Sequence, residues 1–129
     1  MKIQTQLSQA SYKSSGGFVG KLQKLIKTEV IPYQYNVLCD KIEGVEKSHV
    51  VENFENAARA LRGEDVRSGF YGMVFQDSDA GKWIEAAAYS LLLFPDSELQ
   101  KTVDELIEKT ILAMRVDEEA INKACAELG

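Results

Sequence analysis

Apolar side chains recur at three- and four-residue steps along most of this chain, which is the spacing of one face of an α-helix. The first such series consists of Leu22, Leu25, Ile26 and Val30. Pro32 follows at once, and a proline has no backbone N–H and presses on the preceding turn. We therefore expect a break or kink at Pro32 and a second helical piece over Tyr33–Ile42, closed by Gly44.

A further helix is predicted by the series Val50, Phe54, Ala57, Ala58 and Leu61. Ser48 stands where a helix cap is expected, and Glu52 in the first turn favours the positive end of the helix dipole. The residues from Arg62 to Gly72 are mostly polar. They predict a loop that has little apolar surface to bury and is therefore mobile.

The next helix is expected to start with Ser78 or Asp79 as its cap and to run through Trp83 to about Phe94, where Pro95 stops it. It is apolar nearly all round, so it must be buried on most sides. Trp83 is accordingly predicted to lie in the core.

A last long helix is predicted from Glu98 to about Arg115, because Asp96, Ser97 and Gln100 form a capping-box signature before it. Its wide apolar stripe contains Leu99, Val103, Leu106, Ile107, Thr110, Ile111 and Met114. Asp117–Leu128 predicts a short final helix.

These elements predict an all-α fold of four or five helices packed as antiparallel hairpins. Residues 1–15 are expected to be an irregular lead-in and residues 16–129 one domain. With 129 residues and 45% hydrophobic content, the chain can bury a real core. Twelve helices of ~11 residues with connections of ~5 need on the order of 190 residues, so a closed twelve-helix barrel does not fit.

Charge and cysteine content narrow the function classes. The formal net charge is −5 and the Lys and Arg residues are not clustered, so nucleic acid is not an expected partner. Two cysteines are too few for a disulfide framework and agree with a reducing compartment. The first ten residues lack the apolar core of a signal peptide, and no run is long enough for a membrane span. The sequence therefore predicts a cytoplasmic protein with no membrane partner.

Polar residues at the start of the Trp83 helix are the candidate binding groups. The side chains of Gln76, Asp77 and Asp79 can donate to or accept from ligand hydroxyl groups, and the ring of Phe75 can stack on the flat face of a ligand ring. Helix capping is the alternative explanation for Asp77 and Asp79. As a catalytic acid and base these two are badly placed, because a pair of catalytic carboxylates must flank the bond that it cleaves at ~5 to 9 Å.

His49 and Glu52 could supply two metal ligands, and Cys39 lies ten positions upstream. A structural zinc requires four ligands, and a catalytic zinc three plus water. We therefore expect no metal and no cofactor in this chain, with His49 as a cap-region or buried, hydrogen-bonded histidine. Cys125 adds nothing to this set.

Four blocks, in order, resemble one known family. They are Gly17-Phe18; Val30-Ile31-Pro32-Tyr33-Gln34-Tyr35; Ile42-Glu43-Gly44 with Ser48-His49-x-x-Glu52-Asn53-Phe54; and the run from Gly72 to Ser90, GMVFQDSDAGKWIEAAAYS. Together they resemble the N-terminal part of the catalytic domain of glycoside hydrolase family 127, the β-L-arabinofuranosidase-like family, from about Gly17 to about Thr110. The resemblance implies the first part of an (α/α)6 barrel and a role in carbohydrate metabolism. It also favours Phe75, Gln76, Asp77 and Asp79 as substrate-binding residues for an L-arabinofuranoside-type sugar.

The same resemblance implies that the family's catalytic groups lie elsewhere. Members carry a zinc site of cysteines and a glutamate, a nucleophilic cysteine and an acid/base glutamate, all downstream of the matched region. Neither Cys39 nor Cys125 matches them, and from Ala113 onward this chain departs from the family pattern. The resemblance therefore implies a glycoside hydrolase fragment that is inactive alone, with zinc expected only in a complete member of the family. The alternative is a non-catalytic helical module that binds a partner, such as the missing remainder of the barrel, or self-associates.

Overall fold

The computed structural model describes residues 14, 16–66, 68–73 and 75–114. It contains α1 (Gly17–Leu25), a π-helical turn η2 (Ile26–Val30), α2 (Ile31–Leu38), α3 (Val50–Leu61), α4 (Ser78–Leu93) and α5 (Ser97–Ala113). No strand occurs among these residues, so the all-α prediction is confirmed. The lead-in at residues 1–13 and the final helix at Asp117–Leu128, with Cys125, lie outside the described residues.

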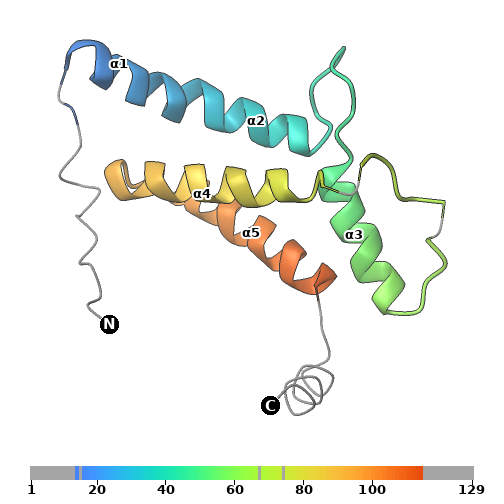
Figure 1. Cartoon of the computed structure of the whole chain (residues 1–129). Coiled ribbons are helices and arrows are strands. Elements are labelled where there is room, and N and C mark those ends of the chain that lie inside the picture. Colours follow the sequence, from blue (N-terminus) through green and yellow to red (C-terminus); the bar gives the residue numbers. More distant parts are fainter. Residues whose placement is uncertain (1–13, 15, 67, 74, 115–129) are drawn as a thin grey trace, which may run out of the picture.

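Two helix pairs are antiparallel, α2 with α4 and α4 with α5 (Figure 1). α4 runs back beneath the continuous path of η2 and α2, α5 returns behind α4, and α3 closes one end by packing on α5 (Figure 1). The core gathers side chains from every helix after η2: Ile31, Leu38, Val50, Val51, Phe54, Ala80, Trp83, Ala87, Val103 and Leu106. Among the described helices, none combines the length and apolar character that a bilayer crossing requires.

The chain does not break at Pro32, where a break or kink was expected. It stays helical from Gly17 to Leu38, with the π-helical turn directly before the proline. In that turn the Ile31 N–H bonds to the Ile26 carbonyl, five residues back. A π turn is wider than an α turn, and it absorbs the missing donor and the bulk of the proline ring without ending the helix.

The helix also ends earlier than Ile42. Asp40 adopts a left-handed conformation with φ of 57°, and the N–H groups of Asp40 and Lys41 bond back to the carbonyls of Val37 and Asn36. This pair of bonds is a Schellman motif, which terminates a helix. Asp40 occupies the position where glycine is usual, and an aspartate tolerates it better than most residues.

α3 begins at Val50 as predicted, but its start is built by more than Ser48. The Ser48 Oγ accepts from the Val50 N–H at 3.2 Å, while the Asp40 carboxylate accepts from the N–H groups of Ser48 and His49 at 2.6 and 3.1 Å. His49, with φ of 56°, is the N-cap residue. Asp40, eight residues before Ser48, therefore helps Ser48 to cap the start of α3. The spacing of apolar residues could not reveal this role.

α4 confirms the core position of Trp83, which is 4% exposed. Its start differs from the prediction, because neither Ser78 nor Asp79 caps it. The N–H groups of Ser78, Asp79 and Ala80 each bond to the carbonyl three residues earlier, so a tight turn replaces a side-chain cap. The helix is also less enclosed than expected: Leu92 is 60% and Tyr89 46% exposed on one side.

α5 starts at Ser97 with Asp96 as its cap, since the Asp96 carboxylate accepts from the Leu99 N–H at 3.2 Å. The Gln100 amide donates instead to Asp104. Val103 and Leu106 enter the core as predicted, whereas the C-terminal part of the stripe, Ile107, Ile111 and Met114, is exposed.

Candidate functional site

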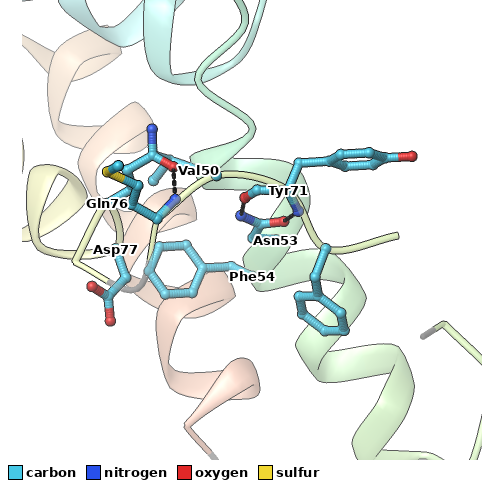
Figure 2. Close-up of a pocket in the computed structure, with 9 residues that line it drawn as sticks. Val50, Asn53, Phe54, Tyr71, Gln76 and Asp77 are labelled. Atoms are coloured by element: carbon cyan, nitrogen blue, oxygen red, sulfur yellow. Dashed lines mark hydrogen bonds between the residues drawn. The ribbon is translucent and has the colours of Figure 1, made fainter. Parts of the chain in front are cut away.

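A pocket opens between the first turns of α3 and the segment that leads into α4 (Figure 2). Its volume is about 350 Å³, and it is lined by Val50, Asn53, Phe54, Phe70, Tyr71, Gly72, Met73, Gln76 and Asp77. We call it the α3 pocket. It combines apolar and aromatic walls with a few polar groups, which is typical of small-molecule sites.

One wall of the α3 pocket is held by Asn53. The Asn53 Oδ1 accepts from the Tyr71 N–H at 3.2 Å, and its Nδ2 donates to the Tyr71 carbonyl at 2.7 Å, so one side chain pairs with both backbone groups (Figure 2). The Tyr71 ring points away from Gln76 and Asp77 and lies 4.8 Å from the His49 ring. The loop expected to be mobile is thus fastened to α3, and Val66 within it is buried.

Gln76 shapes the opposite side of the same pocket. Its Oε1 accepts from the Met73 N–H at 2.7 Å. The amide lies directly against Gly72, where a Cβ would come within 1.6 Å of the Gln76 Oε1, and Gly72 has φ of 94°. Only glycine fits this position, since the space and the left-handed backbone both exclude a side chain.

The four predicted sugar-binding residues do not form one cluster. Gln76 and Asp77 line the α3 pocket, whereas Phe75 lines none of the described pockets and is 64% exposed. Asp79 borders a different groove of about 480 Å³, which we call the α2–α4 groove; it is lined by Tyr33, Gln34, Val37, Leu38, Asp79, Lys82, Trp83 and Ala86. There the Asp79 Oδ1 is 2.9 Å from the Lys82 Nζ. Asp77 and Asp79 therefore share no cavity in which they could flank one bond.

His49 lies beside the α3 pocket in a small polar cluster. Its Nδ1 is 2.8 Å from the Glu52 Oε2 and 3.7 Å from the Asp40 Oδ2. These three side chains could each offer a metal ligand, with the ligand atoms within 4.8 Å of one another. Asp40 already accepts two backbone N–H groups at the positive end of α3, a place that disfavours a cation. The sequence paired His49 with Glu52 and missed Asp40.

Cys39 stands apart from that cluster and is half-buried against the core beside Tyr35. Burial, together with the neighbouring Cys39 side chain, raises the pKa of Tyr35 to about 12. The Tyr35 ring packs on Trp83 with 4.9 Å between centroids, as expected of a packing residue. Tyr33, for which packing was also expected, is 52% exposed at the α2–α4 groove.

The residues that sequence reasoning overlooked are Asn53 and Asn56. Asn56 is buried on α3, and its Nδ2 donates to the Gly69 carbonyl at 2.7 Å. Asparagine is unfavourable inside a helix because its amide competes for backbone groups. Two asparagines three residues apart in a helical series are a signal that their amides bind backbone from another segment.

Comparison with known proteins shows to which family this helical scaffold belongs. The family model described as "Beta-L-arabinofuranosidase, GH127 catalytic domain" matches residues 14–115, which is more than half of the chain. The chain belongs to the GH127 β-L-arabinofuranosidase catalytic-domain family. The resemblance carried by the four sequence blocks is thereby confirmed.

Two GH127 relatives show how much of the family this chain represents. A non-reducing end β-L-arabinofuranosidase of Bifidobacterium longum subsp. longum is 39% identical, over 71% of this chain and 15% of that protein. The crystal structure of Ara127N-Se, a GH127 β-L-arabinofuranosidase from Geobacillus stearothermophilus T6, superposes with a TM-score of 0.66 at 46% identity, covering 75% of this chain and 14% of that one. The chain therefore spans about one seventh of these GH127 proteins.

The structure also shows what the GH127 blocks do within this segment. The Trp83 Nε1 donates to the Ile31 carbonyl at 2.9 Å, which joins the second and fourth blocks across the core. Asn53 joins the third block to Tyr71, directly before the fourth. Much of the matched sequence thus builds the scaffold, and of the four predicted residues Gln76 and Asp77 lie at the α3 pocket.

Proposed function

We propose that this chain is a sugar-facing N-terminal segment of a β-L-arabinofuranosidase-like glycoside hydrolase, and that the α3 pocket binds an L-arabinofuranoside-type sugar. The observation that carries the proposal is the pocket itself. Its volume of about 350 Å³ suits one small sugar, and the Asp77 carboxylate and Gln76 amide stand beside Phe54 and Phe70. Hydroxyl groups need such acceptors and donors, while the faces of a sugar ring pack on aromatic and aliphatic walls.

We further propose that the 129-residue chain does not hydrolyse the sugar by itself. Retaining and inverting glycosidases need two groups on either side of the scissile bond. Asp77 and Asp79 border separate cavities, and Cys39 is packed beside Tyr35, away from the α3 pocket. In this proposal the family's zinc and catalytic cysteine come from the part of a complete member that this segment does not match.

Sugar binding is tested by titrating the isotope-labelled chain with methyl β-L-arabinofuranoside and following backbone amide resonances by NMR. We expect saturable shifts at Tyr71, Gly72 and Asp77. Asp77→Asn should weaken binding on the order of five- to tenfold, because hydrogen bonds to a carboxylate are stronger than neutral ones. Asp79→Asn in the α2–α4 groove is the matched control and should leave the affinity unchanged. A wild-type chain without saturable shifts, or equal losses in both variants, would refute this placement of the sugar.

A second candidate function is self-association through exposed helices, and α1 favours it. Within the described residues no side chain of α1 is buried, and the exposed Phe18, Leu22 and Leu25 form an apolar face that Ile26 continues into η2. The ion pair to the start of α5 comes only in η2, where the Lys27 Nζ lies 3.7 Å from the Asp96 carboxylate. An uncovered apolar face of this kind favours assembly with another protein surface or a second copy of the chain.

A further inference from the structure

One face of α3 carries a row of polar side chains that hold the loop before α4. The row consists of His49, Asn53, Asn56 and Arg59, spaced four, three and three residues apart, so these residues share a helical face. We call it the α3 row. Its partners follow in reverse order along the loop: the Tyr71 ring, the Tyr71 backbone, the Gly69 carbonyl and the Glu64 carboxylate. The loop therefore runs antiparallel to α3.

The far end of the α3 row is a chain of side-chain contacts. Arg59 donates to the Glu64 carboxylate at 2.7 Å and to the Asn56 Oδ1 at 3.2 Å. The hydrogen bond from Arg59 lowers the pKa of Glu64 below its usual value. Gly69 fits tightly against this end, since a Cβ there would lie 2.8 Å from the Asn56 Nδ2. These contacts anchor the loop but do not line the α3 pocket.

Asn53 differs from the rest of the row because it is also a wall of the pocket. It satisfies both backbone groups of Tyr71, and the residues that follow, Gly72 and Met73, form the rim that the Gln76 amide closes. Fixing Tyr71 therefore fixes where this rim begins. A preformed rim lowers the ordering cost that a ligand must otherwise meet on binding.

We propose that Asn53 is a positioning residue that keeps the α3 pocket preformed by holding the backbone of Tyr71, whereas Asn56 anchors the loop without setting the pocket. The assignment rests on the proposed function for the identity of the ligand. The hydrogen bonds between Asn53 and the Tyr71 backbone form within the chain and do not depend on a ligand. The two can therefore be measured separately.

The experiment compares Asn53→Asp with Asn56→Asp in the full 129-residue chain. Each change keeps the side-chain acceptor and removes one amide donor, to the Tyr71 carbonyl in the first case and to the Gly69 carbonyl in the second. Asn53→Ala removes both contacts to Tyr71. Amide hydrogen exchange by NMR is measured at Tyr71 and Met73, the thermal midpoint is recorded, and each variant is titrated with methyl β-L-arabinofuranoside.

We expect exchange at Tyr71 to accelerate about fivefold or more in Asn53→Asp and further in Asn53→Ala, since each lost hydrogen bond contributes modestly to protection. The sugar affinity should fall about threefold or more in both, out of proportion to any change in thermal midpoint. Asn56→Asp should lower the thermal midpoint at least as much as the Asn53 variants do, because Asn56 is buried. It should nevertheless keep the wild-type affinity for the sugar. In the wild type, the Asn53 side-chain amide should show a downfield resonance that marks its bond to Tyr71.

Unchanged exchange at Tyr71 in Asn53→Ala would overturn the positioning role. So would wild-type affinity in both Asn53 variants, or an affinity loss in Asn56→Asp equal to theirs. If the wild-type chain binds no sugar while Tyr71 exchange still depends on Asn53, the proposed ligand is wrong and the holding of Tyr71 stands.

Discussion

Replacing Trp83 with alanine should remove a substantial part of the stability of this protein. The side chain is 4% exposed, packs against Tyr35 with 4.9 Å between ring centroids, and donates its Nε1 hydrogen to the Ile31 carbonyl at 2.9 Å. It therefore links α4 to the junction of η2 and α2, where Pro32 has already removed one backbone donor.

The magnitude follows from these contacts. Truncating a buried tryptophan to alanine costs ~3 to 5 kcal/mol through lost burial and the cavity left behind. Loss of the indole donor leaves a buried carbonyl with one partner fewer, a cost of roughly 1 kcal/mol within that range. Domains of this size are stable by about 5 to 15 kcal/mol, so Trp83→Ala should remove roughly a fifth or more of the total.

Urea and thermal unfolding followed by far-ultraviolet circular dichroism measure this loss without relying on tryptophan fluorescence. Trp83→Phe is the matched control, because it keeps an aromatic ring against Tyr35 and removes the donor to Ile31. We expect it to lose about half as much stability as the alanine variant, or less. A Trp83→Ala protein with the wild-type midpoint would refute the packing of α4 on α2, and equal losses in both variants would assign the whole effect to the hydrogen bond.

The remaining predictions concern metal, titration, activity and assembly. Elemental analysis of chain purified without a metal-affinity tag should find no stoichiometric zinc, and one tightly held zinc per chain would contradict our interpretation of Cys39 and His49. The pKa of Tyr35 rises from 10.0 to about 12 on folding, so its contribution to stability is complete below pH 10 and is lost as the pH rises through about 12. Urea unfolding at several pH values across that range measures this loss of stability. The part that is due to Tyr35 should be absent in Tyr35→Phe. The 129-residue chain should not hydrolyse an aryl β-L-arabinofuranoside, and turnover that Cys39→Ser abolishes would reveal a compact enzyme instead of a fragment. Analytical ultracentrifugation should show concentration-dependent assembly that the double change Leu22→Glu and Leu25→Glu weakens, whereas assembly unchanged by it would exclude the α1 face as the contact.

Local patterning was sufficient to predict α3, α4 and α5, but not the continuous course of the first helical stretch through Pro32 or its end at Leu38. The helical series around Val50 and Leu61, and the series through Val103 and Leu106, have the helical period because one face of each helix must meet the core. Trp83 could be assigned to the interior for the same reason. Pro95 and the oxygen-bearing side chain of Asp96 act on adjacent backbone, so the boundary between α4 and α5 was also within reach of the sequence.

Tertiary structure decided everything that depends on which segments meet. The carboxylate of Asp40 at the start of α3 binds backbone groups that the spacing of apolar residues does not specify. Asn53 becomes informative only when Tyr71, eighteen residues away, lies against it. A helical period shows which side chains face the core, whereas a pocket forms between two segments that are distant in the sequence. For that reason the sequence could name Phe75, Gln76, Asp77 and Asp79 together as candidate binding residues. Only the folded chain shows that Gln76 and Asp77 line the α3 pocket and that the other two do not.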